Sequence, residues 1–132
     1  MINNNFEKKL KSKEFVFTAE TSPPDSTVRS EITDRVLCLK DLADAINVTD
    51  GASAKSHLSS LVVSSIIKDI EIEPILQLTT RDRNRIAIQS DLLGAWTLNI
   101  QNILCIYGDQ VETGDQPETK EVRDLDTLGV IN

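Results

Sequence analysis

The sequence predicts an α/β fold built from parallel β/α units. Short apolar runs alternate with longer segments in which apolar residues recur at helical spacing. In the clearest unit, Glu73–Gln110, the runs Pro74–Thr79 and Asn102–Tyr107 flank one helix. The apolar face of that helix carries Ile88, Leu92, Ala95 and Trp96. Two short strands joined by a helix make a parallel βαβ unit.

A leading helix is predicted over residues 3–12, where Phe6 and Leu10 lie four positions apart. We therefore divide the chain into this helix, residues 1–13, and one domain, residues 14–132. At 132 residues the chain has the length of about one domain.

The first β/α unit combines a strand over Glu14–Glu20 with a helix over Val28–Leu42. Three consecutive apolar residues predict that the strand is buried: Phe15, Val16 and Phe17. Between strand and helix, Thr21–Ser26 contains two consecutive prolines, which predict a loop. The predicted buried side of the helix carries Ile32, Val36, Leu39 and Ala43.

The second unit combines a strand over Ala45–Thr49 with a helix over His57–Ile70. The predicted buried side of this helix carries Leu58, Leu61, Val62, Ile66 and Ile70. After the fourth strand, Gln110–Glu121 is polar and predicts a long loop, which is uncommon unless it is functional or disordered. Asp124–Ile131 predicts the start of a further helix.

Two architectures accommodate short apolar strands that are covered by helices. One is an open doubly wound sheet, and the other is part of a TIM-type (β/α)8 barrel, which needs about 250 residues. No G-x-G-x-x-G motif follows the first strand, which argues against a dinucleotide-binding Rossmann unit. In both architectures ligands bind at the carboxyl ends of the strands.

Composition argues against several classes of function. The net charge of −7, with scattered basic residues, argues against a nucleic-acid binder. No apolar run approaches the roughly 20 residues of a membrane span, and the polar N-terminus lacks a signal-peptide core. Cys38 and Cys105 lie far apart in apolar segments and predict two buried thiols in a cytoplasmic protein. A single histidine, His57, argues against a zinc site.

Two carboxylates lie at predicted strand ends. Glu20 closes the first strand and is either a solvated or capping carboxylate or a general acid. Asp109 follows Gly108 after the fourth strand and is either a turn residue or a partner for a polar heterocycle. In a barrel, the first and fourth strands lie across the mouth from each other, so both carboxylates would face one cavity.

Other polar residues also fall near strand ends. Thr49 and Gln77 lie on predicted buried strands and must find either a structural hydrogen bond or a ligand. A charged cluster follows the third strand: Arg81, Asp82, Arg83 and Arg85. It predicts local ion pairs with Asp82 as the N-cap of the next helix, or a site for an anionic ligand group. His57 is interpreted as a surface or capping residue.

Five stretches resemble methylenetetrahydrofolate reductase, in the order and with the spacing of that family. They are FVFTAETSPP, DAINVTDGASA, EPILQLTTRDRNR, SDLLGAWTLNIQNILCIYGD and TGDQPETKEVRDLDTLGV. Together they cover nearly the whole chain from about residue 12 onward, and they are closest to the short bacterial and archaeal form. Arg123 and Gln116 depart from the family pattern, which usually has an aromatic residue and a histidine there.

The resemblance implies the N-terminal half of a (β/α)8 barrel that holds FAD at the carboxyl ends of its strands. NAD(P)H would reduce the flavin, which would then reduce 5,10-methylenetetrahydrofolate to 5-methyltetrahydrofolate. Glu20 matches the proton donor that helps to open the methylene bridge, and Asp109 matches the carboxylate beside the flavin and the pterin. Flavin-contact positions correspond to Thr49, Asp50, Gln77, Tyr107, Gly108 and Asp109. The segment GDQPETKEVRDLD matches the loop that passes the adenosine and phosphate end of FAD.

A half-barrel leaves its first and fourth strands as open edges, which recruit another strand or aggregate. We therefore expect a homo-oligomer, or a partner subunit that completes the barrel. The rival hypothesis is a non-catalytic, flavodoxin-like module that binds a flavin or a partner.

Overall fold

A single sheet of parallel strands organises the computed structural model, which describes residues 5–132. The strands are β1 (Thr18–Thr21), β2 (Ala45–Val48), β3 (Pro74–Thr79) and β4 (Asn102–Ile106). Each strand pairs in parallel with the next one along the chain, so the spatial order is β1-β2-β3-β4. The predicted succession of parallel β/α units is therefore confirmed.

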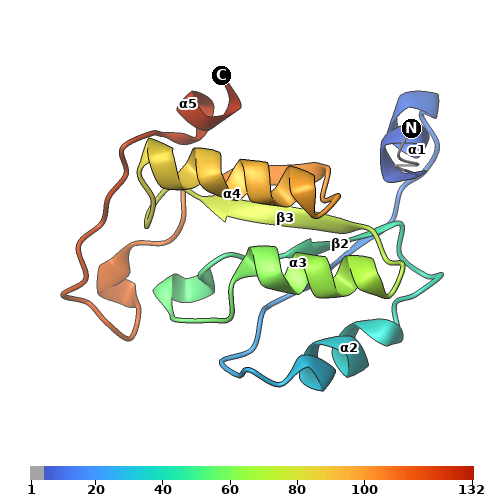
Figure 1. Ribbon diagram of the computed structural model, residues 1–132, viewed down its shortest axis with the longest axis horizontal. Helices are drawn as coiled ribbons and strands as arrows, with labels where there is room; N and C mark the ends of the chain where they lie inside the picture. Colours follow the sequence, from blue (N-terminus) through green and yellow to red (C-terminus); the bar gives the residue numbers. More distant parts are fainter. Residues whose placement is uncertain (1–4) are drawn as a thin grey trace.

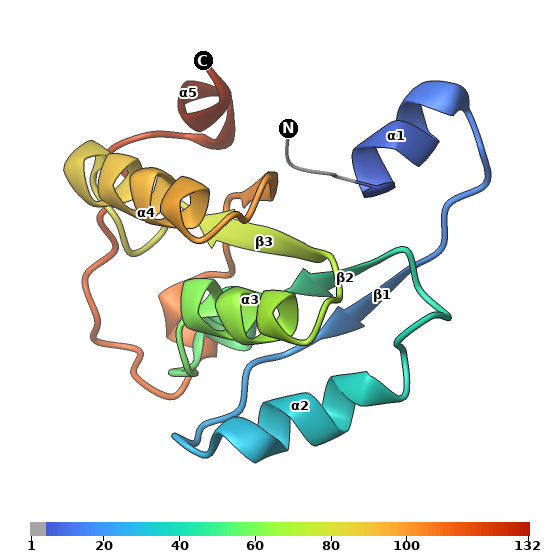
Figure 2. The same cartoon turned by 45° about the vertical axis from the view of Figure 1, so that its right-hand side comes forward.

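Helices lie before, between and after the strands, and those between the strands cover one face of the sheet. They are α1 (Asn5–Ser12), α2 (Arg29–Leu37), α3 (Ser60–Asp69), α4 (Arg85–Thr97) and α5 (Thr127–Ile131), with two short 3₁₀ turns, η1 (Ala52–Ala54) and η2 (Val111–Thr113). Helices α2, α3 and α4 lie side by side against the same face (Figures 1 and 2). Parallel crossovers are almost always right-handed, so strands in sequential order place every connecting helix on one face.

This strand order argues against one of the two architectures that the sequence allowed. A flavodoxin-like sheet places its first strand between the second and third, and a doubly wound sheet has helices on both faces. Neither description fits the order β1-β2-β3-β4, so the flavodoxin-like prediction is wrong. Sequential parallel strands with helices on one face match successive units of a (β/α)8 barrel.

Two apolar clusters hold the helices on the sheet. In the larger cluster, α2 and α3 pack on β2 through Ile32, Val36, Ile46, Val48, Val63, Ile66, Ile67 and Ile72. In the smaller cluster, Ala95 of α4 and Ile100 pack on Leu76 of β3. Strand β3 is buried along its whole length, which explains why it reads in the sequence as a continuous apolar run.

The opposite face of the sheet carries the polar strand residues. Ala19 and Leu76 pack into the two clusters, and neighbouring residues on a strand point to opposite faces. Glu20 and Gln77 therefore point away from the helices. Asn47 pairs with Glu20 across β1 and β2 and lies on the same face.

The first strand is shorter than predicted. It begins at Thr18, where pairing with Ala45 starts, and not at Glu14. The preceding residues have no neighbouring strand, which leaves the side chain of Phe15 88% exposed and that of Phe17 55% exposed. The prediction that this aromatic run is buried is therefore wrong.

The predicted helices are longer than the observed ones at several ends. Helix α2 ends at Leu37, and the chain then turns through Asp41 at a φ of +67°. Helix α3 begins at Ser60 instead of His57, and α5 begins at Thr127. Residues 3 and 4 of the predicted leading helix lie outside the described residues.

Besides Phe15 and Phe17, three more side chains predicted to be buried are exposed, those of Val62, Trp96 and Cys38. Val62 is 45% exposed because the neighbouring Val63 faces the core, and Trp96 is 68% exposed beside the buried Ala95. Cys38 is an exposed free thiol, whereas Cys105 is a half-buried one. Helices α3 and α4 therefore carry apolar residues beyond the faces that contact the sheet.

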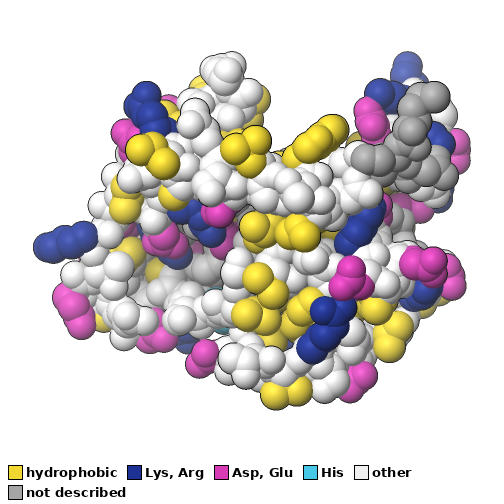
Figure 3. Space-filling model, viewed as in Figure 1, with side chains coloured by type: hydrophobic (Ala, Val, Ile, Leu, Met, Phe, Trp, Pro, Cys, Tyr) yellow, Lys and Arg dark blue, Asp and Glu magenta, His cyan; other side chains and the backbone are white. Residues whose placement is uncertain are grey.

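Charged and hydrophobic side chains are interspersed over the helix-covered face (Figure 3). Exposed hydrophobic side chains of α4 contribute to this surface, among them Ile86 and Leu93. Within residues 5–132, no helix has the length and apolar character that a membrane span requires.

We predict that Ile67→Ala destabilises the fold much more than Ile86→Ala does. Both isoleucines lie in helices, but Ile67 is 0% exposed and Ile86 is 73% exposed. The first change should cost about 3 kcal/mol of unfolding free energy by opening a core cavity. The second should cost less than about 0.5 kcal/mol. Urea unfolding followed by circular dichroism measures both, and equal losses would contradict the assignment of the core.

Candidate functional site

A pocket lies at the carboxyl edge of the sheet, on the side that the helices leave open. Its volume is about 380 Å³, within the range of small-ligand sites. We call it the carboxyl-edge pocket, and it is lined by Glu20, Thr49, Asp50, Ala52, Gln77, Ile106, Gly108 and Asp109. All the catalytic and flavin-contact residues that the resemblance implies line it except Tyr107, whereas the charged cluster Arg81, Asp82, Arg83 and Arg85 lies outside its lining.

Gln77 and Glu20 are linked to each other inside this pocket. The side-chain amide of Gln77 donates a hydrogen bond to the Glu20 carboxylate at 3.3 Å. Gln77 is only 8% exposed, whereas Glu20 is exposed. The buried amide therefore orients a carboxylate that solvent can still reach.

Thr49 has a polar atom without a protein partner. Its hydroxyl is buried and forms no hydrogen bond with any residue of the described part of the chain. Buried hydroxyls are normally paired, and Thr49 is only 8% exposed at the wall of the pocket. A ligand with a hydrogen-bonding group could satisfy this hydroxyl.

The Gly108-Asp109 turn follows β4 and packs tightly against the end of β3. Gly108 has a φ of +85°, and a Cβ there would lie 2.2 Å from the Thr79 hydroxyl. Only glycine fits this position. The carboxylate of Asp109 then accepts a hydrogen bond of 2.7 Å from the backbone amide of Ser53, which ties the turn to the loop after β2.

Asp50 has a carboxylate that the protein already satisfies. It accepts hydrogen bonds from the Ser60 hydroxyl at 3.0 Å and from the Thr79 amide at 2.9 Å. Arg83 adds two more, the shorter at 2.6 Å. With 8% exposure and four donors, this side chain holds the protein together more than it offers a contact to a ligand.

Arg83 extends the same network to α4. Its guanidinium also pairs with Asp91 at 2.8 Å and donates to the Thr79 carbonyl at 3.2 Å. Burial alone would lower the pKa of Arg83, but the hydrogen bonds and charges of Asp50 and Asp91 outweigh it and raise that pKa. The arginine therefore remains charged.

The N-cap of α4 is Asn84, and the prediction of Asp82 is wrong. The Asn84 side chain accepts a hydrogen bond of 3.0 Å from the Ala87 amide. Asp82 instead receives two hydrogen bonds of 2.7 Å from the guanidinium of Arg81. The predicted local ion pair is present for Arg81 with Asp82, whereas Arg83 pairs with Asp50 and Arg85 pairs with Asp124, both distant in the sequence.

Tyr107 lies outside the pocket lining and carries an arginine on its ring. The Arg123 guanidinium stacks 3.7 Å from the ring centroid and donates to the Tyr107 carbonyl at 2.7 Å. A hydrogen bond from Arg123 also lowers the pKa of Glu121. These contacts fasten the chain after η2 to β4. Sequence reasoning missed this stacking, although Arg123 was noted as a departure from an aromatic residue.

His57 and Cys105 lie outside the lining of the carboxyl-edge pocket. One ring nitrogen of the half-buried His57 lies 3.3 Å from the Ala52 carbonyl, and the other is buried without a hydrogen bond to the described residues, which does not match the predicted surface or capping role. Burial raises the pKa of the Cys105 thiol and so disfavours the reactive thiolate. Over residues 5–132, no group of three or more His, Cys, Asp or Glu residues is arranged to hold a metal ion.

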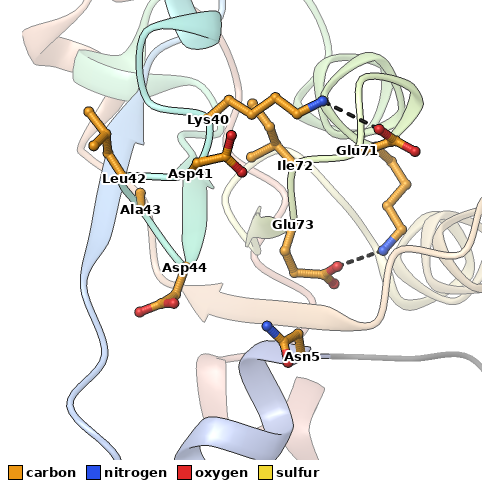
Figure 4. A pocket seen from close by; sticks show the side chains of 10 residues that line it. Asn5, Lys40, Asp41, Leu42, Ala43, Asp44, Glu71, Ile72 and Glu73 are labelled. Atoms are coloured by element: carbon orange, nitrogen blue, oxygen red, sulfur yellow. Dashed lines mark hydrogen bonds and ion pairs between the residues drawn. The ribbon is translucent and has the colours of Figure 1, made fainter.

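A second cavity, of about 500 Å³, lies at the opposite edge of the sheet, where β2 and β3 begin. Two ion pairs cross its wall, Lys40 with Glu71 and Lys68 with Glu73 (Figure 4). Nearby, Asp44 accepts hydrogen bonds from Lys9 of α1 and from the Phe17 amide. Paired charges at this amino edge serve the fold, unlike the unpaired hydroxyl at the carboxyl edge.

Comparison with known proteins agrees with the resemblance noted in the sequence. The model of the family described as methylenetetrahydrofolate reductase matches residues 5–130. No curated protein matches the chain.

We predict that Asp50→Asn strongly destabilises the protein, whereas Asp124→Asn does not. Asp50 is the buried partner of Arg83, and Asn removes its charge and leaves the guanidinium with the Asp91 carboxylate alone, at a cost of about 3 kcal/mol. Asp124 pairs with Arg85 at the surface, where such pairs contribute little. The midpoints of urea unfolding measure both changes, and a wild-type midpoint for Asp50→Asn would contradict the network.

Proposed function

The chain belongs to the methylenetetrahydrofolate reductase family, and on that premise we propose that its carboxyl-edge pocket takes part in FAD-dependent reduction of 5,10-methylenetetrahydrofolate. The product would be 5-methyltetrahydrofolate, with NAD(P)H as the electron donor. One observation carries the proposal: Glu20, Thr49, Gln77 and Asp109 come from four different parts of the chain and line one pocket.

The residues present fit a flavin ring. The unpartnered Thr49 hydroxyl and the Gln77 amide offer hydrogen bonds to a polar heterocycle. Gly108 also lines the pocket, and its missing side chain lets the turn close onto Thr79. When bound, FAD supplies the hydride that folate reduction requires. We assign the flavin ring to the pocket, and its adenosine and phosphate end to the segment GDQPETKEVRDLD.

Glu20 is the proposed proton donor. It would protonate the folate nitrogen as the methylene bridge opens, which leaves an electrophilic iminium carbon. The hydrogen bond from Gln77 supports this role because it orients the carboxylate, and exposure to solvent allows its proton to be replaced. Asp109 would hold the substrate by hydrogen bonding to the pterin, while the Ser53 amide fixes the carboxylate.

We further propose that β1 and β4 pair with strands of another molecule, either a second copy or a partner subunit. Within the described residues each of these strands has one neighbour in the sheet. Unpaired strand edges recruit further strands. Such pairing would also wall the pocket, which lies between the ends of these two strands.

We predict that the purified chain, mixed with FAD, retains a flavin absorbance spectrum through a sizing column, at the elution volume of an assembly larger than a monomer. Sedimentation equilibrium checks the mass. A colourless protein would contradict flavin binding, and a clean monomer with a cooperative melt would contradict strand pairing. Flavin binding without reoxidation by methylenetetrahydrofolate would indicate a binding module instead of a reductase.

We predict that Glu20→Gln slows reoxidation of the reduced flavin by methylenetetrahydrofolate by about 100-fold or more, because a general acid typically contributes that much. Reduction of the flavin by NADH should stay near the wild-type rate, since it needs no proton from Glu20. Stopped-flow absorbance measures both half-reactions. Glu14→Gln is the matched control, an exposed glutamate that precedes β1. Wild-type rates for Glu20→Gln in both half-reactions would contradict the assignment.

A further inference from the structure

Arg81 is buried at the carboxyl edge, in the loop after β3, with only 3% of its surface exposed. One guanidinium nitrogen, Nη1, donates to the carbonyls of Gly51 and Asp109, each at 3.3 Å. The other two nitrogens hold the Asp82 carboxylate at 2.7 Å each. One side chain therefore connects the loops that follow β2, β3 and β4.

We propose that Arg81 is a positioning residue that sets the place of Asp109 in the carboxyl-edge pocket by clamping the Asp109 backbone to the loop after β2. The catalytic meaning of this clamp rests on the proposed function. The clamp itself is a property of the protein without any ligand.

Two hydrogen bonds hold Asp109 in place. Arg81 holds its carbonyl oxygen, and the amide of Ser53 holds its carboxylate at 2.7 Å. Because Arg81 also binds the Gly51 carbonyl, two residues before Ser53, it fixes both partners of the shorter hydrogen bond. Loss of the clamp would free the loop and the turn to move relative to each other.

Gly51 leaves room for this guanidinium, and hydrogen bonds hold the backbone of Arg81 at both its amide and its carbonyl. Gly51 has a φ of +59°, and a Cβ there would lie 2.5 Å from Nη2 of Arg81. The Arg81 amide donates to the Thr79 hydroxyl at 3.2 Å, and its carbonyl accepts from the Val122 amide at 2.8 Å. The side chain therefore starts from a fixed backbone.

A lysine could not replace this arginine. The planar guanidinium directs several donors at fixed angles, whereas the ammonium group of lysine concentrates its donors on one atom. Lysine would keep the positive charge. Its single nitrogen could not bind both oxygens of Asp82 and, at the same time, the carbonyls of Gly51 and Asp109. Arg85 offers a matched control, because it pairs with Asp124 at the surface and lies outside the pocket lining.

The first experiment measures amide hydrogen exchange by NMR in the full chain, with Arg81→Lys, Asp109→Asn and Arg85→Lys. The amide of Ser53 should exchange at least about tenfold faster in Arg81→Lys, which frees the turn and the loop, and faster in Asp109→Asn, which replaces a charged acceptor with a weaker neutral one. The amides of Ile46 and Val48 in β2 report global stability in the same spectra. Unchanged protection of Ser53 in a folded Arg81→Lys protein would overturn the proposal.

A second measurement needs no variant and covers the case in which Arg81→Lys fails to fold. In the wild-type protein the guanidinium of Arg81 should show separate, slowly exchanging Nη signals, since both nitrogens are held. Arg85, whose side chain is 60% exposed, should show averaged signals. Averaged signals for Arg81 would overturn the proposal, because a rotating guanidinium cannot clamp Asp109.

Flavin titration then connects the clamp to the site. Arg81→Lys should weaken FAD binding by about tenfold, and the double variant with Asp109→Asn should bind no more weakly than Asp109→Asn alone. Additive losses would overturn the link between the two residues. If the wild-type chain binds no FAD, the proposed function fails. The amide exchange of Ser53 and the guanidinium signals of Arg81 still test whether Arg81 positions Asp109.

Discussion

The buried pair of Asp50 and Arg83 is the interaction on which the carboxyl edge depends. Asp50 lies directly after β2, and its carboxylate binds the first turn of α3, the end of β3 and, through Arg83, helix α4. Burying two charges costs solvation, and only a fully satisfied pair recovers that cost. Four hydrogen bonds to Asp50 meet this condition. The loops that form the pocket are therefore fixed to one another before any ligand arrives.

The two edges of the sheet use their polar groups differently. At the amino edge, charged residues pair among themselves, as Lys68 does with Glu73, and α1 is tied down through Lys9 and Asp44. At the carboxyl edge, the Thr49 hydroxyl forms no hydrogen bond with any described residue, and Asp109 is exposed. Parallel strands separate these tasks because all of them end at the same edge. One edge can stabilise the fold while the other offers groups to a ligand.

The sequence was most informative where burial is complete on both faces. The predicted bounds Pro74–Thr79 are those of β3, because this strand is buried along its whole length and is apolar except for Gln77 and Thr79. The prediction of a buried strand at Phe15 and Phe17 was wrong, because apolar residues are buried only where another element covers them. Most of the pocket residues were foreseen, because strand ends in a parallel sheet converge. The pairing of Asp50 with Arg83 was not, because no local pattern links residues so far apart in the sequence.

The close approach of Gly108 to the Thr79 hydroxyl also bears on the fidelity of folding. Neighbouring strand residues face opposite sides, so slippage of β4 by one position would turn every side chain of that strand over. Such a slip would bring a residue with a Cβ to the place where the Thr79 hydroxyl leaves no room for one. The glycine therefore disfavours a shifted alignment of β4 against β3. The alignment that it allows is the one that places Asp109 at the pocket.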